Sequence, residues 1–533
     1  MTQPGAAGGS GGPREADDIA ALAKGGRTNF FGFLLRLAAR LPFLFIAGRI
    51  YGAEALGRFA YAILIVEFAA QLATQGLKRG LAQQLASTDR PHVCVVWDAM
   101  LVAFLASAAA SAVLVAFPGA MFPNSAIHGL EWLLPLVVFA IAGADVALAA
   151  LAYQHNVRAT VTARAIVEPW TISIAAFALS YLSARDGLII AYVLSMLAAL
   201  AASLWPLYKA YGIPTGWRPA PGGLWVMARR NTPLAAADAI EWGSRRIDIA
   251  ILGLFFSPAV VGVYYVAQQV ASLPQKLKTS FDPILGPVIT QKLSEGDTKA
   301  VARQVRQVGF WIIAAQAGIA LALGIPGEAV MGLVGAAFIG GTGILAFLLA
   351  AEVVTATAAV SESALVYVAR HRNLMISLAM IAVQAMLSVA LILGIRAIHL
   401  PEPLVAAFGL ESQRLPDEFA AAGPAIALML SLGMASVVKA RLLGRILGAP
   451  VQGWRWPLVW AAAAAGSAGY LITTLPASLE WVELSLGIPM ILAIFGVIVW
   501  RQGFTHEDRV LFRIRGGGEP TLPPPPGVSP PGR

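Results

Sequence analysis

Apolar stretches of about twenty residues alternate with short polar connections along most of this chain. Between residues 28 and 501 the sequence divides into about 14 such stretches, and about 20 apolar residues are what an α-helix needs to cross a bilayer. The pattern predicts an all-α polytopic membrane protein. The predicted spans are 28–50, 57–75, 93–117, 131–153, 161–183, 186–208, 230–254, 258–290, 306–331, 341–368, 373–397, 420–447, 454–474 and 480–501.

The positive charges predict the orientation of these spans. The chain has 38 Lys and Arg residues, and most of them fall on every second connection, as expected for cytoplasmic loops. With both termini in the cytoplasm, the exceptions are Arg49, Arg58, Arg185, Arg396 and Arg414 outside, and Arg36, Arg40, Arg245 and Arg246 within spans. We therefore predict a multi-pass protein of a bacterial inner membrane with cytoplasmic N- and C-termini.

The composition excludes several other classes of protein. Hydrophobic residues make up 58% of the 533 residues, which is typical of a membrane protein rather than a soluble domain. The net charge of +9 follows from the cytoplasmic loops, so no nucleic-acid partner is expected. The single cysteine, Cys94, excludes an internal disulfide and a thiolate metal cage. No Walker-type loop occurs, and we expect neither a cofactor nor a metal.

Composition along the chain predicts its organisation. The first residues lack the apolar core of a signal peptide, and the last residues are rich in proline. The predicted segments are a disordered cytoplasmic N-terminus (1–27), an N-terminal lobe of spans one to six (28–208), a cytoplasmic linker (209–229), a C-terminal lobe of spans seven to twelve (230–447), two additional spans (448–501) and a Pro-rich cytoplasmic tail (502–533). An acidic external insert occupies 398–419.

A faint internal repeat supports two pseudo-symmetric six-helix lobes. Gly57-Arg-Phe59 and Gly262-Val-Tyr264 both open a span and lie 205 residues apart. Six spans separate them, and an even number gives both copies the same orientation, so the repeats are parallel. Transporters often build a substrate path between two such halves. Coincidence is the alternative, since a glycine two residues before an aromatic residue is common in membrane helices.

Ionisable residues inside the spans are the main candidates for a functional site, because each is costly in hydrocarbon. Arg36 and Arg40 share one helix face, and Arg40 precedes Gly57 by the same 17 residues as Arg245 precedes Gly262. The repeat would make Arg40 and Arg245 equivalent. Arginine suits phosphate oxygens, so we predict a cationic cleft that binds an anionic head. The proposed substrate-binding residues are Arg36, Arg40, Arg245 and Arg246.

Carboxylates accompany these arginines. On one continuous helix, Asp238, Glu241, Arg245 and Asp248 would line a single stripe, with Arg246 a quarter-turn away. These acids either neutralise Arg245 internally or face the cleft. Membrane carboxylates can also couple transport to H⁺ or Na⁺. The candidates for cleft acids or ion coupling are Asp238, Glu241, Asp248, Glu352 and Glu362.

Three motifs resemble bacterial polysaccharide exporters and O-antigen-type lipid-linked oligosaccharide flippases, within the multidrug/oligosaccharidyl-lipid/polysaccharide exporter superfamily. The first motif is Arg49-Ile-Tyr-Gly-Ala-Glu-Ala-Leu-Gly-Arg-Phe59. The second is Arg246-Ile-Asp-Ile-Ala-Ile-Leu-Gly253 with Val261-Gly-Val-Tyr-Tyr-Val-Ala267, and the third is Gly332-Leu-Val-Gly-Ala-Ala-Phe338. The resemblance covers roughly residues 25–500.

The resemblance implies two six-helix lobes around a V-shaped cleft, followed by two extra helices. It implies transport of a polyprenyl-diphosphate-linked glycan to the outer leaflet by alternating access, with the diphosphate held by cationic residues on the first helices of the lobes. Arg36, Arg40, Arg245 and Arg246 occupy comparable places. The acid-rich seventh span and the external insert depart from the family pattern.

Other functions remain open at this point. A peptidoglycan-precursor lipid flippase would share the layout of spans. A multidrug antiporter driven by H⁺ or Na⁺ would have an apolar or acidic cleft. A membrane glycan polymerase or ligase would need a larger external loop than 398–419. Further partners implied by the resemblance are membrane lipid and a glycan polymerase or glycosyltransferase. The transport itself would make and break no covalent bond, so we do not expect an enzyme.

Overall fold

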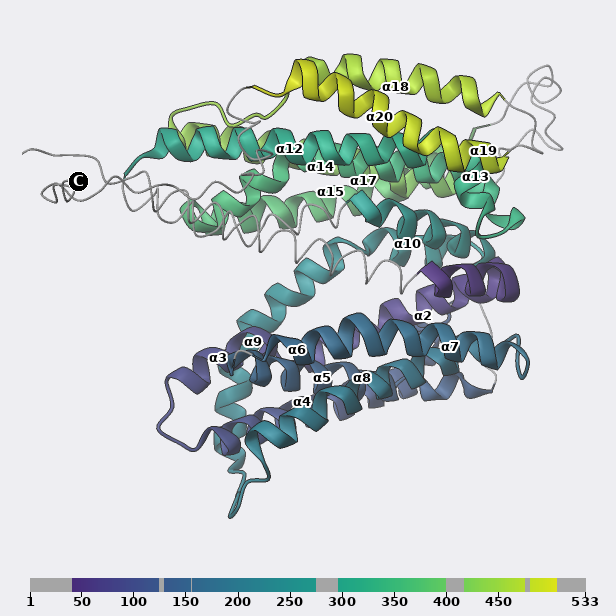
Figure 1. The fold of residues 1–533 in the computed structure, drawn as a ribbon. Coiled ribbons are helices and arrows are strands. Elements are labelled where there is room, and N and C mark those ends of the chain that lie inside the picture. Colours follow the sequence, from purple (N-terminus) through teal and green to yellow (C-terminus); the bar gives the residue numbers. More distant parts are fainter. Residues whose placement is uncertain are drawn as a thin grey trace, which may run out of the picture.

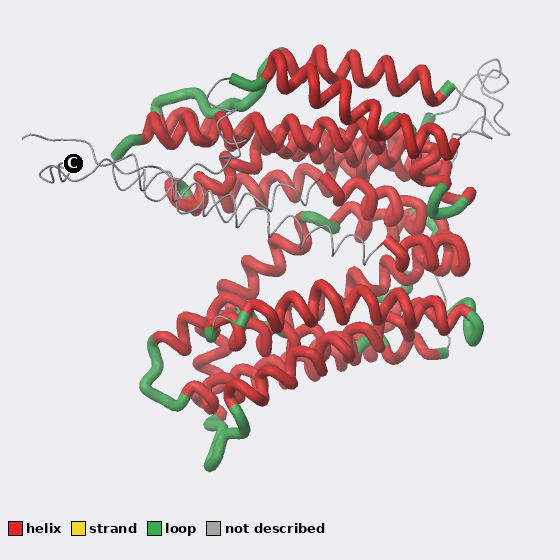
Figure 2. The backbone as a smooth tube through the Cα atoms, viewed as in Figure 1, coloured by secondary structure: helices red, strands yellow, loops and turns green. Residues whose placement is uncertain are grey.

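The computed structural model describes residues 41–123, 129–154, 156–274, 296–398, 417–474 and 480–505. Within these ranges every regular element is a helix (Figure 2). Nine of the described helices are long and apolar enough to cross a membrane. Several predicted features lie outside the described residues. They are the terminal segments 1–40, which includes Arg36 and Arg40, and 506–533, together with residues 275–290 of the eighth predicted span and most of the 398–419 insert.

The helices of the first half follow one another with short connections. A helix over 41–46 runs into a π-helical turn, Ala47–Tyr51. The following elements are α2 (Gly52–Ala73), α3 (Leu77–Ala86), α4 (His92–Ala116), α5 (Leu136–Tyr153), α6 (Val157–Thr160), a π-helical segment (Val161–Val167), α7 (Glu168–Ser180) and α8 (Gly187–Tyr211). Helices α2, α4, α5, α7 and α8 pack on one another and form the lower group in Figure 1.

The helices of the second half form the upper group in Figure 1. They are α10 (Ile247–Phe255), a helix over 258–274, α12 (Thr298–Gly324), α13 (Gly327–Gly332), α14 (Thr342–Val368), α15 (Arg370–Arg396), α17 (Asp417–Leu447), α18 (Pro457–Thr473), α19 (Glu480–Val482) and α20 (Ile488–Ile498). Helix α17 packs against both α14 and α15, and α18 and α20 pack together beside α12.

Helix α9 (Pro221–Ser244) connects the two groups. It packs against α2, α3 and α4 and then runs diagonally toward α10 (Figure 1). It begins inside the segment predicted as a linker, because Pro221 stands in the first turn, where the missing N–H costs nothing. The ribbons of the two groups lie close at the end where α7 connects to α8 and diverge toward α3 (Figure 1).

The seventh predicted span, 230–254, is not one continuous helix. Helix α9 ends at Ser244 and α10 begins at Ile247, so Arg245 and Arg246 form the break. Gly243 and Ser244, both poorer helix formers than alanine, precede the two arginines. The break changes the direction of the chain, so the single stripe predicted from continuous helical spacing is wrong: the charges on its two sides reach different partners.

Small residues allow the helices to approach closely in both groups. In the first group the buried alanines of α2 and α5 include Ala60, Ala62, Ala140, Ala142 and Ala147. Lipid tails are as apolar as leucine side chains, so helices in a membrane gain more from close backbone packing than from burying large residues. Close packing of this kind holds the helices of the group together.

Candidate functional site

The two repeat glycines touch across the boundary between the helix groups. A Cβ atom on Gly57 of α2 would lie 1.7 Å from the carbonyl oxygen of Pro258, and one on Gly262 would lie 2.1 Å from the carbonyl oxygen of Ala53. Ala53 and Pro258 are themselves 205 residues apart, as the glycines are. The contact is therefore reciprocal, and neither glycine can carry a side chain without separating the helices.

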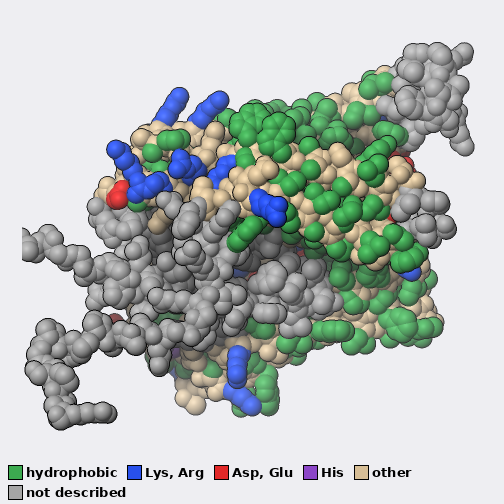
Figure 3. Space-filling model, turned by 45° about the horizontal axis from the view of Figure 1, so that its top comes forward, with side chains coloured by type: hydrophobic (Ala, Val, Ile, Leu, Met, Phe, Trp, Pro, Cys, Tyr) green, Lys and Arg blue, Asp and Glu red, His purple; other side chains and the backbone are tan. Residues whose placement is uncertain are grey.

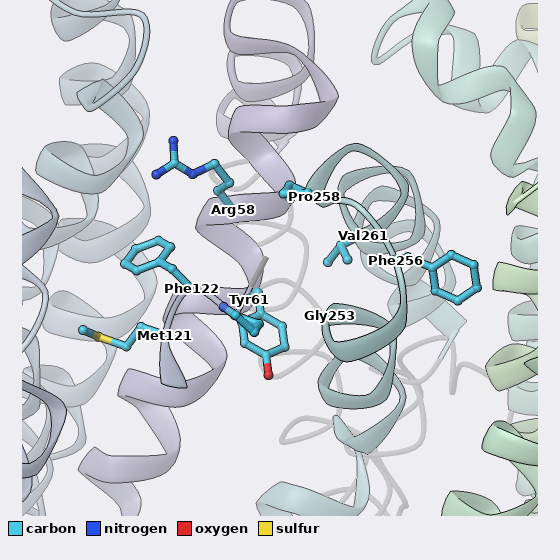
Figure 4. Close-up of a pocket in the computed structure, with 10 residues that line it drawn as sticks. Arg58, Tyr61, Met121, Phe122, Gly253, Phe256, Pro258 and Val261 are labelled. Carbon is cyan, nitrogen blue, oxygen red and sulfur yellow. The ribbon is translucent and has the colours of Figure 1, made fainter. Parts of the chain in front are cut away.

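A second close contact lies one turn away. The ring of Tyr61 lies against Gly253, where a Cβ atom would be 2.0 Å from two ring carbons. Figure 4 shows Tyr61 on α2 beside Gly253. The space left between these elements is a cavity of about 20 Å³, lined also by Arg58, Phe122 and Phe256. This is room for about one water molecule, so the boundary is closed here.

The third sequence motif joins the same boundary. The side chain and the carbonyl oxygen of Val334 leave no room for a Cβ atom on Gly48, and the Arg49 Nε donates a hydrogen bond of 2.8 Å to the carbonyl oxygen of Leu333. All three motifs thus meet at one interface. We refer to the contacts of residues 48–61 with residues 253–262 and 333–338 as the seam.

Arg246 crosses from one helix group to the other, beyond the seam. Its Nη1 lies 2.8 Å from Glu67 Oε2 of α2, and its guanidinium stands 4.9 Å from the centre of the Trp242 ring. The Tyr192 hydroxyl of α8 donates a 3.0 Å hydrogen bond to the other oxygen of Glu67. The Arg246 side chain is still 38% exposed, so it is oriented by its partners and remains open to a further anion.

The two aspartates on either side of the helix break have separate partners. Asp238 is buried in α9, and its Oδ1 lies 2.8 Å from the Nε of Arg79 on α3. Asp248 is fully buried in α10 and accepts hydrogen bonds from the Tyr264 hydroxyl at 2.7 Å and from Gln268 at 3.0 Å. Asp238 is therefore paired with a helix of the first group, whereas Asp248 is hydrogen-bonded within the second group.

The remaining candidates do not gather at Arg246. Arg245 is exposed at the end of α9, and the side chain of Glu241 lies outside the described residues. Glu362 of α14 lies 3.0 Å from the Nζ of Lys439 on α17. Glu352, also on α14, is half-buried. The structure thus brings Arg246 to the boundary, while Glu362 is part of an ion pair within the second group.

Sequence reasoning missed a second embedded arginine. Arg164 pairs with Asp145 of α5 and lies 3.0 Å from Glu168 at the start of α7. The charge pattern alone groups it with the cytoplasmic arginines, because it lies near the start of the predicted span 161–183. Its spacing of four residues from Glu168 was a usable signal, since side chains at i and i+4 meet on a helix. Glu67 was likewise visible only as an isolated acid.

Comparison with known proteins gives a family and a fold. The family model described as "Polysaccharide biosynthesis protein" matches residues 46–322, just over half of the chain. No curated protein sequence matches. Among the described residues no group of three or more His, Cys, Asp or Glu side chains is arranged to hold a metal ion.

Solved structures share the arrangement of helices. The chain is similar to the lipid II flippase MurJ in an inward closed conformation, with a TM-score of 0.62, 12% identity, and 89% of this chain and 99% of that one covered. It is also similar to an inward-facing multidrug resistance MATE family transporter of the MOP superfamily, with a TM-score of 0.60 and 13% identity. That match covers 78% of this chain and 98% of the other. A third similar structure is a MOP superfamily transporter from Pyrococcus furiosus, with a TM-score of 0.51 and 13% identity. That match covers 81% of this chain and 95% of the other. At these identities the likeness shows a shared fold.

Proposed function

Because the chain belongs to the polysaccharide biosynthesis protein family, we propose that it carries a polyprenyl-diphosphate-linked oligosaccharide from the cytoplasmic to the outer leaflet of a bacterial inner membrane. It is a multi-pass membrane transporter with the MOP superfamily fold and not an enzyme. The sugars and the diphosphate need a polar path through the bilayer, while the lipid tail can stay in hydrocarbon.

The observation that carries the proposal is the position of Arg246. It is an arginine of the seventh predicted span that lies at the boundary between the helix groups, held by Glu67 and Trp242 and still 38% exposed. A guanidinium offers five N–H donors in a planar fork that matches phosphate oxygens. One carboxylate occupies part of that fork, and the remaining donors can bind the diphosphate. We include Arg36, Arg40 and Arg245 in the same proposed site.

The seam supports alternating access. The helix groups touch through Gly57 and Gly262 at one end, with a cavity of only about 20 Å³ beside the contact, and their ribbons diverge toward the other end (Figure 1). With both termini in the cytoplasm, as the positive charges predict, the diverging end faces the cytoplasm, where the substrate is made. In our proposal 14 spans form two pseudo-symmetric lobes and an additional helix pair, and the lobes rock about the seam.

Ion coupling is part of the proposal for the second lobe. Asp248 is fully buried and held by Tyr264 and Gln268. Burying the negative charge of a carboxylate is costly, and a bound proton or Na⁺ would neutralise that charge. We propose that Asp248 carries the coupling ion, with Glu352 as a second candidate.

A genetic experiment tests the proposed function. The gene is deleted in its host, and surface polysaccharide and polyprenyl-linked glycan in the cytoplasmic leaflet are measured. The deletion strain should lose the surface glycan and accumulate the lipid-linked repeat unit. Wild type should restore both, whereas Arg40→Ala, Arg245→Ala and Arg246→Ala, expressed at wild-type level, should not.

The matched control is Arg303→Ala on α12, an exposed arginine remote from the seam, which should complement fully. Accumulation of a peptidoglycan precursor would replace the oligosaccharide by that lipid as the substrate. An unchanged glycan together with new sensitivity to drugs would contradict the proposal and favour an efflux antiporter, with Arg246 in a structural role.

A further inference from the structure

A second and larger pocket lies between α15 and α17, remote from the seam. Its volume is about 400 Å³, within the range of small-molecule sites. The lining residues come from the first turns of α15 and the last turns of α17. They are Arg372, Met375, Ile376, Val438, Arg441, Leu442 and Arg445. On each helix they are spaced three or four apart, so two facing helix stripes form the walls.

The walls are divided into a charged zone and an apolar zone. Arg372 lies in the first turn of α15 and Arg445 in the last turn of α17. Met375 and Ile376 lie one turn further into α15, and Val438 lies two turns before Arg445. Arg372 and Arg445 therefore mark the end of the pocket at the helix termini, and Met375, Ile376 and Val438 lie toward the middle of the helices. Arg441 and Leu442 lie between these two zones.

The three arginines differ from the lysine beside them. Lys439 is buried, lies 3.0 Å from Glu362 Oε1 and donates a 3.0 Å hydrogen bond to the Ser377 hydroxyl. Its charge is used to hold α17 against α14 and α15. Arg372, Arg441 and Arg445 are exposed and form no ion pair with another described residue. Their charges are therefore available to an anion that enters the pocket.

The apolar zone is open to the surroundings. Met375 is 69% exposed and Val438 is 40% exposed, on a surface that spans a membrane. Figure 3 shows Lys and Arg side chains gathered toward one end of the visible face, beside a broad apolar surface. A ligand here has an anionic group at the membrane surface and an apolar chain directed into the bilayer.

We propose that this pocket binds the phosphate headgroup of an anionic membrane lipid, with one acyl or prenyl chain along Met375 and Val438. Arginine clusters at the ends of membrane helices are suited to lipid phosphates, and three guanidiniums around one pocket give several charge-assisted hydrogen bonds. With both termini in the cytoplasm, the lipid lies in the cytoplasmic leaflet. The proposal does not rest on the transported substrate, and either can fail without the other.

Native mass spectrometry of the purified full chain tests this site. Dioleoylphosphatidylglycerol, dioleoylphosphatidylcholine and a polyprenyl phosphate are titrated separately, and inorganic phosphate and diphosphate are added as competitors. We expect the wild type to retain the anionic lipids and not phosphatidylcholine. The triple variant Arg372→Gln/Arg441→Gln/Arg445→Gln should bind them at least tenfold more weakly. The ratio between phosphatidylglycerol and polyprenyl phosphate identifies which lipid source the pocket prefers.

The control removes the same number of charges from α12. Lys299→Gln/Arg303→Gln/Arg306→Gln should bind lipid as the wild type does, because these residues do not line the pocket. Val438→Trp, which fills the apolar zone and keeps every charge, should also weaken retention and serves if the triple variant does not fold. Equal loss of lipid in both triple variants would overturn the proposal. Displacement of the lipid by millimolar inorganic phosphate would also overturn it, since the chain would then contribute nothing.

Discussion

Replacing Gly57 by alanine should shift the equilibrium between the two conformations that we propose for this protein. The new Cβ atom would lie 1.7 Å from the carbonyl oxygen of Pro258 and 2.7 Å from the backbone nitrogen of Gly262. All these atoms belong to backbone, so no side chain can rotate away. The two helices would have to move apart by more than about 1 Å to reach an ordinary contact.

The magnitude follows from the cost of overpacking, about 1–3 kcal/mol for extra carbon atoms in a well-packed interior. This cost applies only to the conformation in which the helices touch here. The conformation with the seam closed should therefore lose about 5- to 150-fold in relative population. In the proposed alternating access, the opposite end of the molecule should close as the seam opens.

Distances between spin labels measure this shift. After Cys94→Ser removes the native cysteine, labels are placed at Asp89, between α3 and α4, and at His371, near the start of α15. Both residues are exposed. The wild type should show mainly long distances, and Gly57→Ala should move the distribution toward shorter ones.

The control is Gly466→Ala in α18, where no heavy atom lies within 4 Å of the added Cβ. It makes the same chemical change in a membrane helix and should leave the distances unchanged. If Gly57→Ala gave the wild-type distribution and wild-type transport, the seam would not limit the motion and our reasoning would be refuted.

Three further predictions concern the embedded charges. Arg246→Gln should lower transport at least tenfold, while Glu67→Gln should retain most of it. The reason is that the proposed anion site needs the guanidinium and not its carboxylate partner. Initial rates of transport into reconstituted vesicles at matched protein levels measure the difference. Glu362→Gln should lower the midpoint of thermal unfolding by leaving Lys439 buried without its carboxylate, at a cost of up to about 3–5 kcal/mol, and Lys439→Met added to it should restore part of the loss. Asp248→Asn should keep the protein folded and abolish the dependence of transport on a H⁺ or Na⁺ gradient, measured by collapsing each gradient in turn; unchanged dependence would exclude Asp248 as the coupling residue.

Much of the fold could be predicted from the sequence, because a membrane span is a local property. Its length is set by the bilayer and its composition by hydrocarbon, so no partner has to be known. The repeat glycines could also be found, since a glycine two residues before an aromatic residue recurs after 205 residues. That the two glycines touch each other could not be predicted, because a pattern of equivalent positions does not say which surfaces meet.

The candidate site was less predictable because it depends on a break in a helix. Helical spacing placed Asp238 and Asp248 on one face, but the chain turns at Arg245 and Arg246. The two aspartates then contact different helix groups. The partners of Arg164 could not be predicted for a related reason, because only tertiary packing brings Asp145 to it. Positions of charges along a span do not specify their neighbours.

The reciprocal contact of Gly57 and Gly262 has the form of an isologous dimer interface, in which each contact occurs twice. In one continuous chain the two halves are free to differ, and here they do. The positions equivalent to Arg246 and Glu67, 205 residues away, are Leu41 and Ser272. The backbone contact is thus duplicated, whereas the ion pair occurs once. A dimer of identical subunits would present two copies of the Arg246–Glu67 pair to a ligand with one polar end, and the single chain presents one.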